Sequence, residues 1–288
     1  MNALSGCGPD ADYAYCEAEL RRGDLDRWLA CLFIPEAKRR HAHALYAFSL
    51  EIARVREIVS QPMPGLIRVQ WWRDALARPD DGDVRANPVA AALADTIQRF
   101  NLPKEAFIEL IDAREFDLFD EPMETVEALE GYAKATSSGL FRMSSMIVAS
   151  EQSAACFAAA EDGGLAYALT GLLRAFPWHS ARGQLFIPLE VLRKHGLGRG
   201  DIAAGRPTPA VLAALADLRG LARKNLNCFL SSIKGLPGSR LAGLLPVSLC
   251  GAYLRQMEKP GYDPFKTAVT LPQWRRQWIL WRAAKKWG

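Results

Sequence analysis

The chain has 288 residues, half of them hydrophobic, which is enough to bury one large hydrophobic core or two modest ones. Its 36 basic and 32 acidic residues give a formal net charge of +4, and both signs are spread along the whole length. This pattern is typical of a solvated surface and argues against a nucleic-acid binder, whose positive charge gathers in one stripe. The six cysteines form no CxxC motif and no cluster with histidine, so neither a disulfide framework nor a zinc site is predicted.

Two further absences bear on location. No stretch approaches the roughly 20 uninterrupted apolar residues that a membrane-spanning helix requires. The acidic beginning of the chain, with Asp10, Asp12, Glu17 and Glu19, has neither the apolar core of a signal peptide nor the Arg/Ser-rich character of a transit peptide. We therefore expect a cytoplasmic protein, or a mitochondrial-matrix protein if the sequence is a processed form.

The predicted elements are helices almost throughout. Apolar residues recur at spacings of three, four and seven around residues 28–33, 45–59, 107–119 and 211–221. Pro and Gly break the pattern at 60–65, 78–88, 102–103, 121–122, 196–209, 235–238 and 259–264, which leaves about ten helical segments. Only residues 184–187 look extended, and residues 196–209 are the best candidate for a mobile loop. One all-α domain over residues 1–288 is predicted.

Two segments carry the most informative residues. Residues 46–57 read YAFSLEIARVRE, and residues 171–188 read GLLRAFPWHSARGQLFIP. Both resemble the squalene/phytoene synthase family, whose members carry YAFxRxxDDxxD in the first place and NxLRDxxEDxxRGRxYLP in the second. The resemblance covers about residues 24–188. It implies an isoprenoid synthase-type fold, a single-domain barrel of helices around a central cavity.

In that family the acidic residues hold Mg²⁺ ions that bind and ionise allylic diphosphates, because Mg²⁺ requires oxygen ligands and neutralises the departing diphosphate. In the first segment here, the acidic positions correspond to Ala53, Arg54 and Glu57. In the second, they correspond to Ala175, Trp178 and His179, and Pro177 is expected to bend or end the helix. We therefore predict no catalytic residue and no metal site, with Mg²⁺ as a cofactor only if other ligands support an active prenyltransferase.

One divergent subgroup of the family shares these losses, namely the assembly factors for respiratory complex I. Its pattern combines YAFxxExAxV, a Gln-aromatic-Trp step, and a Pro-x-His step before a basic residue. This chain has the matching residues Tyr46, Glu51, Gln70, Pro177, His179 and Arg182. The resemblance implies complex I subunits as partners, and it makes Tyr46, Glu51, Gln70 and His179 candidates for ligand binding.

Arginines suggest a second kind of site. Arg54, Arg174 and Arg182 are predicted to form an anion pocket, because guanidinium groups bind phosphate in a bidentate manner. Its ligand would be an isoprenoid or isoprenoid diphosphate in the cavity, bound without being ionised. Arg54 is also placed to pair with Glu51 at i, i+3. His179 is either a base or metal ligand, or a hydrogen-bonded structural residue.

Other acidic clusters were weighed as replacement metal sites. Asp112 and Glu115 share one face of a predicted helix, but Asp117 and Asp120 do not extend that face. The run at residues 80–83 lies beside a proline in a loop and cannot present ligands in helical register. Solvated acidic surfaces are the expected outcome for both.

A basic, Trp-rich helix is predicted at about residues 270–287. Trp274, Trp278 and Trp281 form one stripe, with Arg and Lys around it. Either this stripe packs on the core, or it contacts a lipid interface or an acidic partner. Contact with lipid would make the protein peripheral at a bacterial inner membrane.

The residues favour a catalytically degraded member of the family that acts as a binding or assembly factor for respiratory complex I. Two alternatives stay open. One is an active Mg-dependent prenyltransferase that condenses two allylic diphosphates, and the other is a carrier of a polyprenyl lipid.

Overall fold

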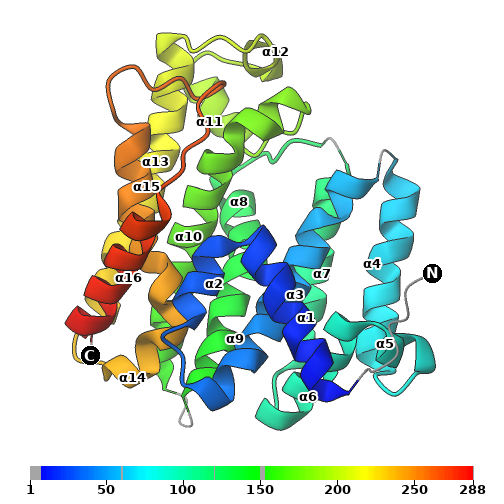
Figure 1. The fold of residues 1–288 in the computed structure, drawn as a ribbon. Coiled ribbons are helices and arrows are strands. Elements are labelled where there is room, and N and C mark those ends of the chain that lie inside the picture. The colour runs from blue at the N-terminus through cyan, green and yellow to red at the C-terminus, as the bar shows by residue number, and fades with distance from the viewer. Residues whose placement is uncertain (1–7, 60, 120, 150–152, 288) are drawn as a thin grey trace.

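The protein is described by a computed structural model of residues 8–59, 61–119, 121–149 and 153–287. Within these ranges every regular element is a helix, so the prediction of an all-α, single-domain fold is confirmed. Figure 1 shows the longer helices standing side by side as a bundle, with the first half of the chain on one side and the last third on the other.

The first half forms one side of the bundle around α3 (Glu36–Ile58), which packs against α1 (Pro9–Gly23) and α6 (Pro88–Phe100). The apolar residues predicted for one face of α3, Leu45, Phe48, Ile52 and Val55, are all buried. The other elements here are α2 (Leu25–Cys31), α4 (Pro62–Ala77), α5 (Gly82–Ala86), α7 (Lys104–Glu115) and the 3-10 helix η1 (Phe116–Leu118).

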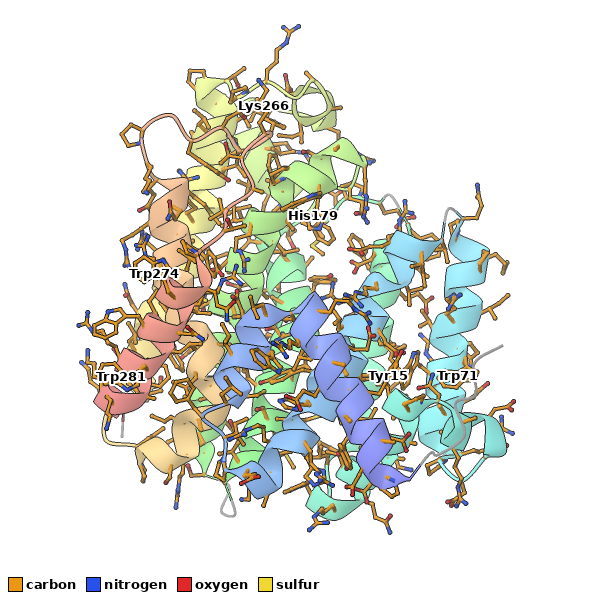
Figure 2. All side chains as sticks on the ribbon, viewed as in Figure 1. Tyr15, Trp71, His179, Lys266, Trp274 and Trp281 are labelled. Atoms are coloured by element: carbon orange, nitrogen blue, oxygen red, sulfur yellow. The ribbon has the colours of Figure 1, made fainter. Side chains whose placement is uncertain are left out.

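The second half is organised by α10 (Ala154–Ala181), which packs along α13 (Pro209–Ser232). The remaining elements are α8 (Val126–Ala133), the π-helix η2 (Lys134–Ser138), α9 (Gly139–Val148), α11 (Leu189–Lys194), α12 (Arg199–Ala203), α14 (Gly238–Leu241), the 3-10 helix η3 (Ala242–Leu249), α15 (Cys250–Met257) and α16 (Gln273–Trp287). Figure 2 shows Trp274 and Trp281 projecting from α16 on the outside of this half.

Three local predictions need correction. Pro177 does not end its helix, because α10 continues to Ala181. The missing N–H of Pro177 falls in the last turn, so little of the helix depends on it. Residues 184–187 form a loop and not a strand. The predicted loop at 196–209 contains the short helix α12. In the described ranges, no helix is long and apolar enough to span a membrane.

Candidate functional site

A cavity of about 790 Å³ lies between the two halves, lined by residues from α1, α2, α3, α7, η1, η2, α10 and α16. Its charged residues are mostly cationic. Seven arginines line it: Arg22, Arg27, Arg56, Arg114, Arg174, Arg182 and Arg276. They face four carboxylates: Asp24, Asp26, Glu57 and Asp117. The cavity therefore has an excess of positive charge, which suits an anionic ligand.

Asp26 joins three distant parts of the chain on one wall of the cavity. Asp24 accepts a hydrogen bond from the backbone of Arg27 and so caps α2, which puts Asp26 in its first turn. The buried Asp26 carboxylate accepts from Arg174 Nη1 at 3.0 Å and from the Tyr253 hydroxyl at 2.7 Å. Arg276 Nε lies 3.2 Å away in an ion pair, although its N–H does not point at the carboxylate. Asp26 thus shares its single negative charge between two arginines.

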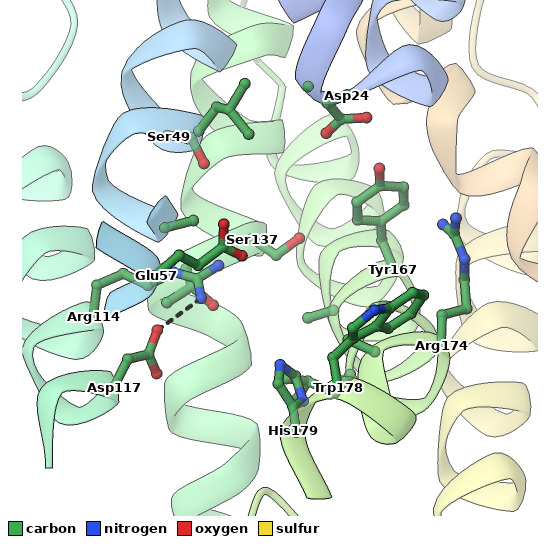
Figure 3. A pocket seen from close by; sticks show the side chains of 18 of the residues that line it. Asp24, Ser49, Glu57, Arg114, Asp117, Ser137, Tyr167, Arg174, Trp178 and His179 are labelled. Carbon is green, nitrogen blue, oxygen red and sulfur yellow. Dashed lines mark hydrogen bonds and ion pairs between the residues drawn. The ribbon is translucent and has the colours of Figure 1, made fainter. Parts of the chain in front are cut away.

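Asp117 is held in the same way on the opposite wall. It accepts from Arg114 Nη1 at 3.0 Å and from the Tyr132 hydroxyl at 2.9 Å, and Figure 3 marks the contact with Arg114. Burial raises the pKa of Asp117, and the charge of Arg114 opposes that shift. The carboxylate is therefore part of a closed network with Arg114 and Tyr132.

Arg27 and Ser137 offer donors that the protein leaves unused. The guanidinium of Arg27 is buried, 5.0 Å from the ring centres of Tyr46 and Tyr167, and pairs with Asp24 at 3.4 Å. Its Nε, and the Oγ of Ser137, are buried without a hydrogen-bond partner among the described residues. Ser137 lies in the π-helix η2, and such helices are common at functional sites. Both atoms have almost no accessible surface, so a ligand in the cavity would reach them only if neighbouring side chains moved.

The end of α10 forms the rim. Gly183, at φ 74°, takes the left-handed conformation that ends the helix, and it brings Gln184 and Phe186 back to the cavity. His179 packs on the ring of Phe186, with centroids 4.6 Å apart. Burial, together with the charges of the nearby Arg114 and Arg182, lowers the pKa of His179 to about 4. His179 is therefore neutral at pH 7.

Of the seven predicted site residues, Arg174, His179 and Arg182 line the cavity and Tyr46, Glu51, Arg54 and Gln70 do not. Tyr46 is 1% exposed, and its hydroxyl donates to the Gly243 carbonyl at 3.3 Å. Gln70 is exposed on α4 and donates to Asp74 at 2.9 Å. Arg54 therefore lies outside the cavity that Arg174 and Arg182 line, and a ligand-binding role for all seven residues stays a prediction.

Arg54 also has a different partner from the predicted one. Its Nη1 lies 3.4 Å from Glu19 on α1, and it influences Glu51 only through its charge. Burial raises the pKa of Glu51, and the charges of Arg54 and Arg68 counter that shift. Neither Glu51 nor Arg54 lines the cavity.

Sequence reasoning missed most of the charged residues in the cavity wall. Arg27, Asp26 and Arg276 carry no family-like motif, and Arg276 was read only as part of a basic helix. The sequence predicts Asp117 only as part of a solvated acidic surface, whereas the structure buries it in the cavity wall. The Asp24-to-Arg27 capping pattern at the start of α2 is the one local signal that could have pointed to this wall.

The residues present do not fit a magnesium centre of the kind that the family resemblance implies. Ala53, Ala175, Trp178 and His179 line the cavity at positions where family members carry carboxylates. No group of three or more His, Cys, Asp or Glu side chains suited to a metal occurs in the described part of the chain.

The alternative acidic clusters serve other purposes. Arg73 donates to both Asp112 and Glu115 at 2.6 Å, as expected for two acids on one face of a helix. Asp80 pairs with Arg85 at 2.6 Å on the surface. Asp120 lies outside the described residues.

Comparison with known proteins adds a second line of information. A sequence profile for squalene/phytoene synthase matches residues 20–282. The rat protein named NADH dehydrogenase (ubiquinone) complex I, assembly factor 6 is 31% identical over 267 residues, which cover 93% of this chain and 80% of that protein. The phytoene synthase of Thermus thermophilus is 28% identical over 268 residues, covering 92% of this chain and 89% of that protein.

Solved structures agree on the architecture. A dehydrosqualene synthase matches with a TM-score of 0.84 at 19% identity, covering 97% of each chain. A squalene synthase from Alicyclobacillus acidocaldarius matches with a TM-score of 0.76 at 23% identity, covering 89% of this chain and 97% of the other. At such identities the likeness concerns the fold alone, and it agrees with the predicted isoprenoid synthase-type architecture.

Proposed function

Because this chain belongs to the squalene/phytoene synthase family, we propose that it keeps the helical scaffold as a non-catalytic binding protein that acts in the assembly of respiratory complex I. The assembly role is supported by the names of several relatives, including the rat protein above and the human one, which is 28% identical over the same length. Loss of catalysis is supported by the cavity itself.

The observation that carries this proposal is the pairing of the cavity's carboxylates with cations. Asp24 is paired with Arg27, Asp26 with Arg174 and Arg276, and Asp117 with Arg114. Mg²⁺ would have to displace these guanidinium groups to gain oxygen ligands. The fourth acid, Glu57, lies on the exposed end of α3. Ionisation of an allylic diphosphate requires metal ions that neutralise the negative charge of the leaving diphosphate. Without bound Mg²⁺, this charge is not neutralised.

The same charges favour binding of an anion. Arg27, Arg174 and Arg276 line the wall, and Arg182 places another guanidinium at the rim. Beside His179 and Phe186, the neighbouring apolar space is only about 20 Å³. That volume holds about one water molecule, so a prenyl chain enters only if leucine and phenylalanine side chains move. We therefore expect a phosphate or diphosphate group to be the part of a ligand that the cavity recognises.

The Thermus thermophilus relative favours one competing function, an active prenyltransferase, and a direct assay separates the two. The protein is incubated with farnesyl or geranylgeranyl diphosphate and Mg²⁺, and released pyrophosphate is measured, with the Thermus thermophilus enzyme as the positive control. We expect no release above that from heat-denatured protein. Release of pyrophosphate would show that the prenyltransferase alternative holds.

Assembly is tested in the host cell with an affinity-tagged chain expressed at its natural level. We expect complex I subunits to co-purify with it, and deletion of the gene to lower the amount of assembled complex. Mass spectrometry of the same preparation reports any bound polyprenyl lipid. A stoichiometric lipid, without complex I subunits and with unchanged assembly, would support the carrier alternative and contradict the proposal.

A further inference from the structure

The last helix, α16, is fixed to the rest of the protein by one side. Leu280 and Ala283 are buried on this side, and the Trp287 ring packs against Phe229 with centroids 5.6 Å apart. Arg276, on the same side, lines the cavity and pairs with Asp26. The orientation of α16 about its own axis is therefore set by contacts with both the core and the cavity wall.

The opposite side of α16 is aromatic and exposed. Trp274, Trp278 and Trp281 are 69%, 52% and 45% exposed, so the interpretation in which this stripe packs on the core is wrong. At about 100° per residue, spacings of four and three place the three indoles within about 60° of one another. The rings of Trp278 and Trp281 stack at 5.1 Å, and with Trp274 and Gln277 they line a shallow surface groove.

The charge on this side has a single sign. Residues 273–287 contain no Asp or Glu, and Arg282, Lys285 and Lys286 are exposed. By helical position, Lys285 lies in line with the tryptophans, and Arg282 and Lys286 lie along one edge of the stripe. An amphipathic helix that turns an aromatic face and cations outward is typical of a helix lying in a lipid interface.

We propose that α16 binds the surface of an anionic lipid bilayer, with Trp274, Trp278 and Trp281 in the headgroup region and the neighbouring cations on lipid phosphates. Indole rings favour this region because they present a broad apolar ring together with an N–H donor. A protein partner fits less well, because lysine is depleted in protein–protein interfaces, whereas Lys285 continues the line of the tryptophans at the C-terminal end of this surface. The binding surface and the cavity residue Arg276 occupy opposite sides of one helix, so docking holds the cavity wall next to the membrane.

Sedimentation with vesicles tests the proposal on the full chain. The probes are vesicles of phosphatidylcholine alone and of phosphatidylcholine with 30% phosphatidylglycerol. We expect binding to the anionic vesicles that weakens as salt is raised, and little binding to the neutral ones. The variant W274Q/W278Q/W281Q should bind anionic vesicles about tenfold more weakly or worse, because it removes the apolar area that inserts.

Two further variants make the test specific. Removing a cation near an anionic surface lowers affinity about fivefold, so R282Q/K285Q/K286Q should lose about 100-fold. The control M63Q/I67Q changes two side chains on α4 that are 65% and 64% exposed, and it should bind like the unchanged protein. Urea unfolding confirms that each variant is folded, which is expected because all the changed side chains are exposed.

Three results would overturn the proposal. One is negligible sedimentation with both kinds of vesicle. Another is equal loss of binding in M63Q/I67Q and in the tryptophan variant. The third is a concentration-dependent dimer, seen by sedimentation velocity, that the tryptophan variant abolishes while vesicles bind nothing, since the occupant of the surface would then be a second copy of the chain.

Discussion

Arg174 on α10 donates to Asp26 on α2 at 3.0 Å, and its guanidinium lies 3.7 Å from the centre of the Tyr253 ring. Asp26 also pairs with Arg276 of α16, so one carboxylate connects segments from both ends of the chain and from its middle. In a metal-dependent enzyme, a buried carboxylate in such a cavity would be free to bind an ion. Here the Asp26 carboxylate balances part of the positive charge of Arg174 and Arg276, and its role is therefore structural and electrostatic.

Replacing Asp26 with Asn tests that role. The variant keeps an acceptor for the Tyr253 hydroxyl but leaves Arg174 and Arg276 without their counter-charge. Removing one partner of a buried ion pair is strongly destabilising, so we expect the free energy of unfolding to fall by about 3–5 kcal/mol in urea titrations at pH 7. The matched control is Glu124→Gln, whose pair with Arg193 is more than half exposed on both sides. This control should change stability by at most about 1 kcal/mol, and equal losses in the two variants would contradict the prediction.

Two glycines of α10 should respond to alanine in opposite directions. A Cβ on Gly164 would lie 2.3 Å from the Cα of Ser138, so either α10 or the π-helix must move. We expect Gly164→Ala to cost about 1–3 kcal/mol or more, because the contact is with backbone. A Cβ on Gly171 meets nothing within 4 Å, and Gly171→Ala should stabilise the protein by about 0.5–1 kcal/mol through helix propensity. Thermal unfolding of both variants checks the two signs, and destabilisation by Gly171→Ala would be the contrary result.

The helices and the family were predictable because the signals are local. Apolar spacing along α3 and α13 depends only on residues within a few turns, and the two motif segments preserve enough neighbours to be recognised. His179 and Arg182, which lie in the second segment, both line the cavity, and their ligand-binding role stays a prediction.

The composition of the cavity was not predictable, because it depends on the rotation of helices and on contacts across the chain. On α3, Ser49, Leu50, Ala53, Arg56 and Glu57 line the cavity, whereas Glu51 and Arg54 do not. A resemblance places a residue along the chain but does not give the direction of its side chain. Asp26 and Arg276 are 250 positions apart, and nothing in either neighbourhood indicates the other.

His179 should make stability depend on pH in a defined window. Burial, with the charges of Arg114 and Arg182, lowers its pKa to about 4 from the ordinary 6.5. Between these values the unfolded chain binds a proton that the folded protein does not, so the stability that neutral His179 provides is complete above about pH 6.5 and is lost as the pH falls toward 4. His179→Gln should therefore reduce the slope of unfolding free energy against pH in this window by up to about 1.4 kcal/mol per pH unit.

Urea titrations at intervals from pH 4 to 7.5 measure that slope. A residual slope is expected in the variant, because burial also lowers the pKa of His41 and of His43 to about 4. The control is Gly164→Ala, which perturbs α10 about four turns away from His179 and removes no titrating group. It should shift stability by a similar amount at every pH and leave the slope unchanged. If His179→Gln also left the slope unchanged, the pKa of His179 would not be lowered in the folded protein. His179 would then gain a proton on the cavity rim as the pH falls below about 6.5, contrary to the prediction.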